Sequence, residues 1–332
     1  MTFKQLPAPH FRTSDSCLLM NLDVLVCVAA LCVFSAIYYG WRPVFIVLLC
    51  MATALVCELL CCALMKRKPT VNDSTALTTG ALVGAMMSPL APYWVGMLAS
   101  AVAICCLKMP FGGTGRNMFN PAAGGVAVVT LLFPSLMFSY PTLDTQLPLS
   151  WDGLSTVLTQ KSPAAQLAAG AVPPYSVSDL LLGRYPGAIG TTAALILIAC
   201  AIYLSIRHSG SPIITVSYLA TCVLGFWLFP QAENALLLEL CAGYLLFAGI
   251  FLMGDPVTAP RFWLARIGYG ILGGSVMILL RHVGQFEEGA CFGILIVNAF
   301  APILDRGAWR LWNAVRRRFE ARAEREVTVD GE

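Results

Sequence analysis

Long apolar runs leave this chain few possible folds. A helix that crosses a membrane needs roughly 17–25 mostly apolar residues, and about ten runs of that kind follow one another along the sequence. The chain is 58% hydrophobic and 12% charged, which is about half the charge of a typical soluble domain. We therefore predict an all-α integral membrane protein rather than a soluble enzyme or a nucleic-acid-binding protein. The runs lie near residues 18–38, 44–65, 74–90, 93–109, 118–139, 188–206, 212–229, 235–253, 264–281 and 289–304.

The 13 cysteines do not indicate a metal site. No two of them form a C-x-x-C pair, the spacing typical of zinc sites and iron–sulfur clusters, and nearly all lie in or next to apolar runs. Buried cysteine behaves as a small hydrophobic residue. We therefore expect these residues to contribute to packing and to bind no metal ion.

The positive charges predict the orientation, because Lys and Arg are enriched in cytoplasmic loops. If the N-terminus is cytoplasmic and the chain crosses an even number of times, only Arg42, Lys161, Arg184 and Arg281 of the 21 Lys and Arg lie outside. An odd number of crossings would put the basic tail or several basic loops on the wrong side. The prediction is a multi-pass protein with both termini in the cytoplasm.

The longest segment without a strong apolar run, residues 140–187, divides the chain into two halves of about five helices each, 18–139 and 188–305. Halves with an odd number of helices insert with opposite orientation, which predicts an inverted repeat with segment 140–187 outside. The tail, 306–332, combines Arg with Trp and Leu. This composition predicts a short amphipathic helix on the cytoplasmic membrane surface.

Two carboxylates lie inside predicted membrane helices, Asp23 in the first and Glu58 in the second. Such a group costs about 2.5–3.5 kcal/mol near the bilayer centre, so it usually faces the interior of the bundle. One interpretation is an ion or proton path. The other is a structural contact with a neighbouring donor or a helix end, which is also our interpretation of Glu239.

Two irregular segments interrupt the apolar pattern. The first runs from Phe111 to Ala122, where glycines precede an Asn-Pro pair at a predicted helix start. Free N–H groups and the positive end of a helix dipole there suit an anion, a phosphate or the electron-rich edge of a flavin ring. The second, Asp255-Pro256-Val257-Thr258, breaks a helix and lines a cavity or forms a tight turn. The candidate binding residues are Gly112, Gly113, Gly115, Asn117, Asn120, Asp255 and Thr258.

Taken together and in order, several segments resemble the RnfD/NqrB family, the large membrane subunits of the Rnf complex and of the Na⁺-translocating NADH:quinone reductase. The resemblance is closer to RnfD, because the N-terminal extension is short. The segments are Ala8-Pro9-His10, Asn21 to Val24, Asp73 to Gly80, Phe111 to Ala122, Ser178 to Gly183 with Pro186 to Thr192, Met253 to Pro260, and Glu288-Gly289 with Asn298 to Pro302.

The resemblance implies a subunit of an ion-translocating oxidoreductase in the bacterial cytoplasmic (inner) membrane. It implies two inverted five-helix halves, an FMN bonded through its phosphate to a hydroxyl side chain outside the membrane, and a noncovalent flavin, riboflavin in the quinone reductase. Electrons would pass between ferredoxin and NAD, coupled to Na⁺ or H⁺ movement. The implied partners are the Rnf-type subunits A, B, C, E and G, a flavin transferase and membrane lipid. The chain is then an enzyme subunit that cannot act alone.

The FMN attachment motif departs from the family pattern, which is approximately D-x-x-[ST]-G-A-[TS]-P-L. Alignment on Pro163 puts Ser162 at the acceptor position and Thr159 at the upstream hydroxyl, but Gln160-Lys161 replace Gly-Ala. Alignment on Asp152 and Ser155 puts Leu158 at the acceptor position, and a third alignment puts Ala165 there. Neither residue can form a phosphoester. Covalent FMN at Ser162, with Thr159 as second choice, is therefore weighed against loss of the bond.

Two other functions fit the same architecture. A channel or transporter for a small polar solute can be built from two inverted halves, and it would have no reason to bind a flavin. A subunit that has lost its flavin would act as a scaffold for its neighbours in the complex. Flavin content separates both alternatives from the electron carrier.

Overall fold

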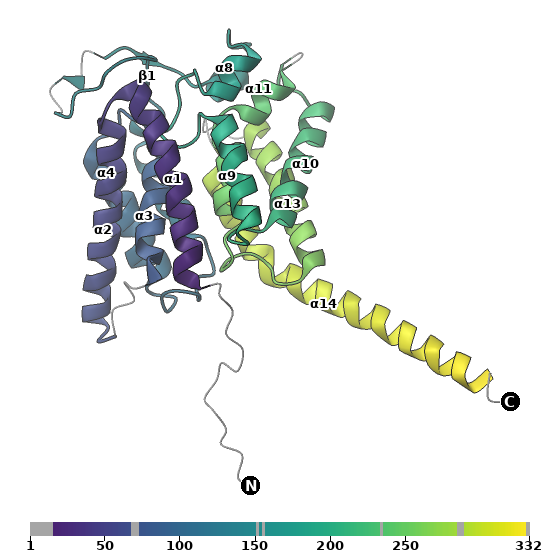
Figure 1. Cartoon of the computed structure of the whole chain (residues 1–332). Coiled ribbons are helices and arrows are strands. Elements are labelled where there is room, and N and C mark those ends of the chain that lie inside the picture. The colour runs from purple at the N-terminus through teal and green to yellow at the C-terminus, as the bar shows by residue number, and fades with distance from the viewer. Residues whose placement is uncertain are drawn as a thin grey trace.

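The computed structural model describes residues 16–67, 73–150, 153–154, 157–232, 235–283 and 289–329, with side chains as far as residue 316. The described part is almost entirely helical (Figure 1). Its strands are β1 (Tyr140–Pro141) and β2 (Thr159–Gln160), which form one short antiparallel pair. The all-α prediction is confirmed for these residues.

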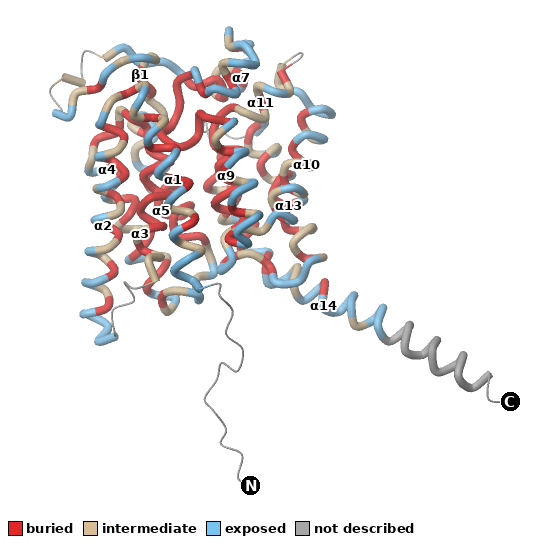
Figure 2. Tube along the Cα trace, viewed as in Figure 1, coloured by how far each residue is buried: buried red, intermediate tan, exposed pale blue. Residues whose placement is uncertain are grey.

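The helices have apolar side chains on their outer faces as well as in the core (Figure 2). Val33, Ile37 and Leu48 on the first two helices are each more than half exposed, as expected for side chains that face lipid. By length and composition, four helices of the described part are candidate membrane spans: α1 (Cys17–Tyr39), α2 (Arg42–Leu64), α13 (Trp263–Val283) and, within α14, Ala290–Arg316. Shorter apolar helices lie at Thr75–Ala85, Tyr93–Lys108, Pro121–Leu132, Ala194–Ile206 and Pro212–Leu228.

Local signals in the sequence explain where the first helices begin and end. The Ser16 hydroxyl caps the start of α1 by accepting a hydrogen bond from the Leu19 N–H, and α1 ends at Gly40, whose φ of 76° favours glycine. The next helices are α3 (Thr75–Ala85), α4 (Tyr93–Val102) with its continuation as the π-helix η2 (Ala103–Lys108), α5 (Pro121–Leu132) and α6 (Pro134–Met137).

The run predicted at 74–90 is helical only as far as Ala85, and buried irregular backbone follows it. Backbone of this kind persists at membrane depth only where protein groups satisfy its hydrogen bonds. The Gly190 N–H donates to the Ala85 carbonyl at 2.7 Å, and the Tyr244 hydroxyl donates to the Met86 carbonyl at 2.6 Å. Pro89 explains why the helix does not continue.

The second half contains a matching interruption. The run predicted at 235–253 is broken after Cys241, and Tyr244, which contacts the first break, lies in this second one. The helices of this half are α9 (Ala194–Ile206), α10 (Pro212–Leu228), α11 (Leu236–Cys241), α12 (Leu245–Phe247), the π-helix η4 (Ala248–Leu252), α13 and α14 (Ala290–Val329). The two broken segments therefore meet in the core.

The C-terminal region differs from its prediction. We expected a helix ending near residue 304 and a separate short helix from Arg306, but α14 runs as one helix from Ala290 to Val329 with Pro302 inside it. It leaves the bundle at the end where α1 begins (Figure 1). Its exposed residues include Trp309 and Trp312, while the side chain of Phe319 lies outside the described part.

Segment 140–187 lies at the opposite end of the bundle (Figure 1). It contains β1, β2 and two short helices, α7 (Pro163–Ala168) and α8 (Val177–Leu182). The Arg42 guanidinium anchors its beginning by donating to the carbonyls of Pro148 and Leu149. The side of the membrane on which this end lies stays a prediction, as do the boundaries of the two halves.

Candidate functional site

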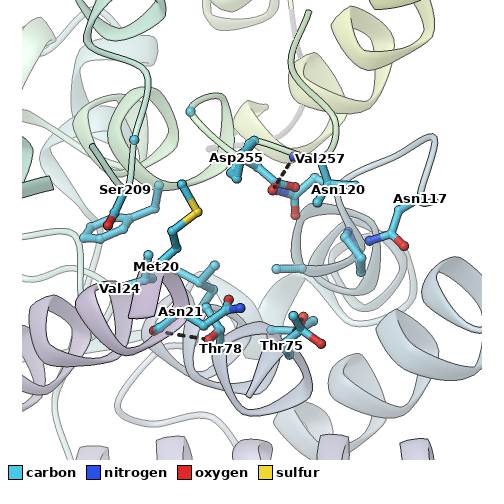
Figure 3. A pocket seen from close by; sticks show the side chains of 18 of the residues that line it. Met20, Asn21, Val24, Thr75, Thr78, Asn117, Asn120, Ser209, Asp255 and Val257 are labelled. Atoms are coloured by element: carbon cyan, nitrogen blue, oxygen red, sulfur yellow. Dashed lines mark hydrogen bonds between the residues drawn. The ribbon is translucent and has the colours of Figure 1, made fainter. Parts of the chain in front are cut away.

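A cavity of about 870 Å³, including its open mouth, lies between the two halves (Figure 3). Its walls come from the starts of α1, α3 and α5, the end of α9 and the chain after η4. It is therefore close to the end of the bundle where α1 begins and α14 leaves. The polar residues on its wall are Asn21, Thr75, Thr78, Thr79, Lys108, Thr114, Asn117, Asn120, Ser209 and Asp255.

Both irregular segments singled out in the sequence meet in this cavity. Asn117 and Asn120 line it from one side and Asp255 from another (Figure 3). Asn120 caps α5 by accepting from the Ala123 N–H at 3.1 Å, and its amide donates to the Leu252 carbonyl at 3.2 Å. This single side chain therefore ties the first segment to the end of η4.

Asn117 supplies an unsatisfied polar group. Its Oδ1 atom is buried and has no hydrogen-bond partner among the described residues. Buried polar atoms are nearly always paired, so an orphan atom beside a cavity indicates a missing partner. A ligand donor in the cavity would satisfy it.

Asp255 is held in place by its own turn. Its carboxylate accepts from the Val257 N–H at 3.1 Å and from the Thr258 hydroxyl at 3.2 Å. Burial raises the pKa of Asp255, and these two hydrogen bonds act in the opposite direction. Thr258 does not line the cavity, so it orients the carboxylate instead of contacting a ligand.

The three candidate glycines have different positions. Gly112, Gly113 and Gly115 have φ values of 115°, 87° and 80°, a region that favours glycine. Only Gly115 lines the cavity, and a Cβ atom there would meet no neighbour within 4 Å. Gly112 and Gly113 therefore form the turn, and the prediction of a ligand contact has structural support only at Gly115.

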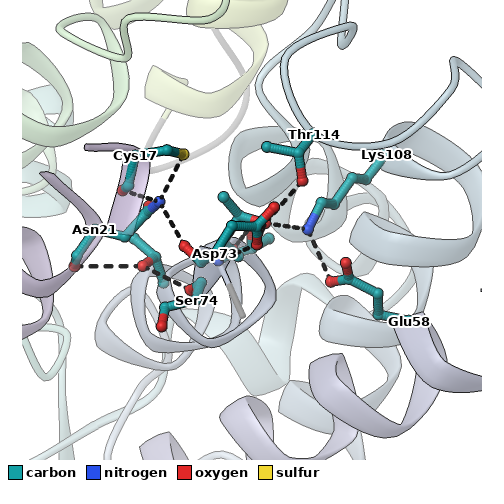
Figure 4. A network of polar contacts seen from close by, with 10 residues as sticks. Cys17, Asn21, Glu58, Asp73, Ser74, Lys108 and Thr114 are labelled. Carbon is teal, nitrogen blue, oxygen red and sulfur yellow. Dashed lines mark hydrogen bonds and ion pairs between the residues drawn. The ribbon is translucent and has the colours of Figure 1, made fainter. Parts of the chain in front are cut away.

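Glu58, predicted as a possible ion-path residue, forms a buried ion pair with Lys108 at 2.8 Å (Figure 4). The Lys108 ammonium also donates to the Thr75 hydroxyl at 2.6 Å. Thr75 in turn bonds Asp73 at 2.7 Å and Thr114 at 3.0 Å. Glu58 does not line the cavity, but Lys108 and Thr75 do.

Lys108 is the cavity residue that the sequence analysis missed. It was counted only as a positive charge on the cytoplasmic side. The available signal was a lysine at the end of one apolar run and a carboxylate deep in another, since a buried charge is usually paired.

Asp23 lies beside the cavity without lining it. It accepts hydrogen bonds from the Tyr203 hydroxyl at 2.9 Å, the Arg207 guanidinium at 3.2 Å and the Ser209 hydroxyl at 2.5 Å. These contacts tie α1 to the end of α9, which agrees with the structural interpretation of this carboxylate. Ion-path roles for Asp23 and Glu58 stay predictions.

The candidate FMN attachment residues lie at the other end of the bundle. Ser162 caps α7 by accepting from the Ala165 N–H at 3.2 Å and is 3% exposed. Thr159 is exposed in β2, so an enzyme reaches its hydroxyl more easily. Asp152 and Ser155, on which another alignment rests, lie outside the described residues.

Comparison with known proteins identifies the family. The sequence model of the NQR2, RnfD, RnfE family matches residues 5–310. The chain belongs to this family. The resemblance seen in the separate segments is thereby confirmed over most of the chain.

Curated relatives agree with this assignment. A protein of Stutzerimonas stutzeri, named as the RnfD-type component of an ion-translocating oxidoreductase complex, is 30% identical over 301 residues, 81% of this chain and 84% of the relative. Proteins of the same name from Shewanella sediminis and Halorhodospira halophila are 28% and 27% identical, covering 92% and 90% of this chain and 96% and 91% of the relatives. The match therefore extends over nearly the full length of these proteins.

Proposed function

We propose that this chain is the flavin-binding membrane subunit of an Rnf-type complex in the bacterial cytoplasmic membrane. In this complex, electron flow between ferredoxin and NAD drives Na⁺ or H⁺ across the membrane. The single observation that supports this most strongly is that one cavity brings together the two segments separately identified as candidate flavin contacts.

The cavity suits the ring system of a flavin. Its size falls within the roughly 300–1,000 Å³ typical of small-molecule sites, and its wall combines apolar side chains with hydrogen-bonding groups. The flavin N3–H needs an acceptor, and Asn117 Oδ1 and the Asp255 carboxylate are suitable acceptors. The flavin carbonyls need donors, which Lys108 and the wall threonines supply.

The charge of the cavity favours riboflavin over FMN. The Glu58 and Lys108 charges cancel, which leaves the Asp255 carboxylate as the remaining charge of the wall in the described part. A phosphate in the same cavity would be repelled by that carboxylate. A neutral flavin avoids this cost.

FMN is assigned to the opposite end of the bundle, bonded through its phosphate to Ser162, with Thr159 as the alternative. Flavins accept electrons singly or in pairs, and the protein contributes position and electrostatics. Two flavins at opposite ends would require electrons to cross the bundle between them.

The broken helices support the architecture of two inverted halves. The apolar helices and the interrupted segment 235–253 correspond in order to the ten runs read from the sequence. Discontinuous helices that meet at an interface between repeats are typical of membrane transport proteins. The two breaks joined by Tyr244 and Met86 fit that pattern.

The residues of this chain would bind, orient and shield the cofactors, and partner subunits would supply the remaining chemistry. Asn117 and Asp255 orient the ring, and Asn120 holds the two walls together. The sequence contains no recognised nicotinamide-binding motif. The reaction therefore requires the other Rnf-type subunits A, B, C, E and G, together with a flavin transferase for FMN attachment.

Flavin content tests the proposal. The full chain is expressed with a flavin transferase and purified, and flavins are measured before and after denaturation. We expect riboflavin to be released on denaturation and to be lost in Asn117→Leu, with Met118→Leu, an exposed neighbour, as the matched control. A flavin-free protein would contradict the proposal. It would favour a scaffold if deletion prevents complex assembly, or a pore if vesicles containing the chain become permeable to a small polar solute.

A further inference from the structure

The Glu58–Lys108 ion pair is built into a rigid contact between two helices. Glu58 is on α2, and Lys108 is the last residue of η2. One turn away on each helix, the sulfur atoms of Cys61 and Cys105 lie 3.6 Å apart. The two helices are therefore antiparallel and in direct contact at two successive positions, which fixes the distance between the charged groups.

The Lys108 ammonium is shared between this ion pair and the cavity. It is 1% exposed, yet it lines the cavity with Thr75 and Thr114 (Figure 4). A lysine ammonium has three N–H donors, and two of them bond Glu58 and Thr75. The remaining donor is available to a group in the cavity.

The position of the charge gives it influence over a bound group. Charges act strongly on each other in a buried site because little water screens them. Lys108 is the basic residue of the cavity wall in the described part, and the Glu58 carboxylate lies 2.8 Å behind it. A change in the charge of a cavity ligand is therefore felt first by this pair.

We propose that the Glu58–Lys108 pair sets the reduction potential of the flavin in the cavity, with Lys108 favouring the reduced form and Glu58 limiting that effect. This inference rests on the proposed function, since it requires a flavin there. A flavin that has gained two electrons and one proton carries one more negative charge than the oxidised flavin. The ammonium stabilises that charge, and the carboxylate behind it opposes it. Both residues act as positioning charges and not as catalytic residues.

The two ends of the pair must then act in opposite directions. Lys108→Gln removes the positive charge and lowers the potential, while Glu58→Gln leaves the ammonium uncompensated and raises it. The double variant removes both charges and stays close to the unmodified protein. A purely structural role predicts instead that both single variants impair folding or flavin binding without opposite shifts in potential.

The experiment is a spectroelectrochemical titration of the noncovalent flavin in the full chain, with Ser162→Ala as background to remove the candidate attachment site. Riboflavin is the probe and dithionite the reductant. We expect each single variant to change the ratio of the dissociation constants of oxidised and reduced riboflavin about tenfold, or about 30 mV for a two-electron couple. Arg207→Gln is the control, because it breaks an ion pair at the same end of the bundle that does not line the cavity.

The outcomes separate the two proposals. Opposite shifts that cancel in the double variant support the role of the pair. Bound riboflavin whose potential is unchanged, or moves the same way in both single variants, overturns this inference and leaves the proposed function intact. Absence of riboflavin from the unmodified chain overturns both. If Lys108→Gln does not fold, the shift in Glu58→Gln relative to the double variant decides, because both retain a glutamine at residue 58.

Discussion

The side-chain amide of Asn120 donates a 3.2 Å hydrogen bond to the carbonyl of Leu252, 132 residues later in the chain. The same side chain caps α5 through its oxygen. Asn120 therefore has two separable functions: it stabilises a helix start, and it holds the two walls of the cavity together.

These functions can be separated by substitution. Asn120→Ala loses both and should lower stability by about 1–2 kcal/mol from the cap alone. Asn120→Ser keeps a capping oxygen but loses the amide that reaches Leu252, so it should retain most of the stability and still bind riboflavin more weakly. Thermal unfolding and riboflavin titration measure the two effects. Unchanged riboflavin affinity in Asn120→Ser would show that the contact with Leu252 does not shape the site.

Asp255 should make the cavity prefer riboflavin to FMN. Asp255→Asn removes the carboxylate charge, so the preference should fall about tenfold, the order expected for one charge at close range in a partly screened site. Competitive binding of the two flavins to the purified chain measures the ratio. Thr258→Val is the control, because it keeps the charge and removes only one hydrogen bond to it.

The same preference should depend on pH in a defined direction. Burial raises the pKa of Asp255, so its charge is lost as the pH falls through a range above that of an ordinary carboxyl group. FMN should therefore bind better, relative to riboflavin, at lower pH. The phosphate of FMN also titrates near pH 6, and Asp255→Asn reports that contribution alone. Identical pH profiles for the two proteins would contradict a role for the Asp255 charge.

The sequence predicted the helix ends and the irregular segments because their causes are local. Asn120 followed by Pro121 is a helix-start signal that depends on a few residues, and the Asp255-Pro256 break depends on the proline itself. The positions of Gly112 and Gly113 in a turn follow from the same local reasoning. These features could be identified without knowing what they contact.

The contacts between segments could not be predicted in the same way. Glu58 was recognised as costly in a membrane, but its pairing with Lys108 depends on how α2 packs against η2, 50 residues later. The end of α3 at Ala85 was missed because the apolar run continues beyond it, although Pro89 and Pro92 were available signals. Its broken backbone is stable only because Gly190 and Tyr244 supply donors from the other half.

Arg42 should be essential for stability at the end of the bundle that contains segment 140–187. Its fully buried guanidinium donates to four carbonyls, those of Pro89, Ala91, Pro148 and Leu149. Arg42→Met leaves these acceptors unpaired and should cost on the order of 2–4 kcal/mol. Arg184→Met is the control, because it removes an exposed arginine at the same end. Equal unfolding temperatures for the two variants would contradict this account.

The orientation of the bundle can be tested with a protease site inserted after Gly170, which is exposed and far from the end where α14 leaves. If segment 140–187 is outside, a protease added to intact spheroplasts should cleave at this site. A second site appended to the C-terminus should be cut only after lysis. Cleavage after Gly170 that requires lysis would reverse the predicted topology.

Covalent FMN should depend on the Ser162 hydroxyl. Expressed with the flavin transferase, the unmodified chain should give a fluorescent band on a denaturing gel, and Ser162→Ala should not. Because Ser162 is 3% exposed and caps a six-residue helix, the transferase must open the start of α7 to reach it. Ser162→Thr keeps both the hydroxyl and the cap, so it should retain the band.

Thr159→Ala is the decisive comparison, since Thr159 is the exposed hydroxyl of the same segment. If Ser162 is the acceptor, this variant keeps its fluorescence. If fluorescence disappears in Thr159→Ala and persists in Ser162→Ala, exposure determines the attachment site and the alignment on Pro163 is wrong. A band that is nonfluorescent even in the unmodified chain would mean that Gln160-Lys161, in place of the small residues of the family pattern, prevent attachment.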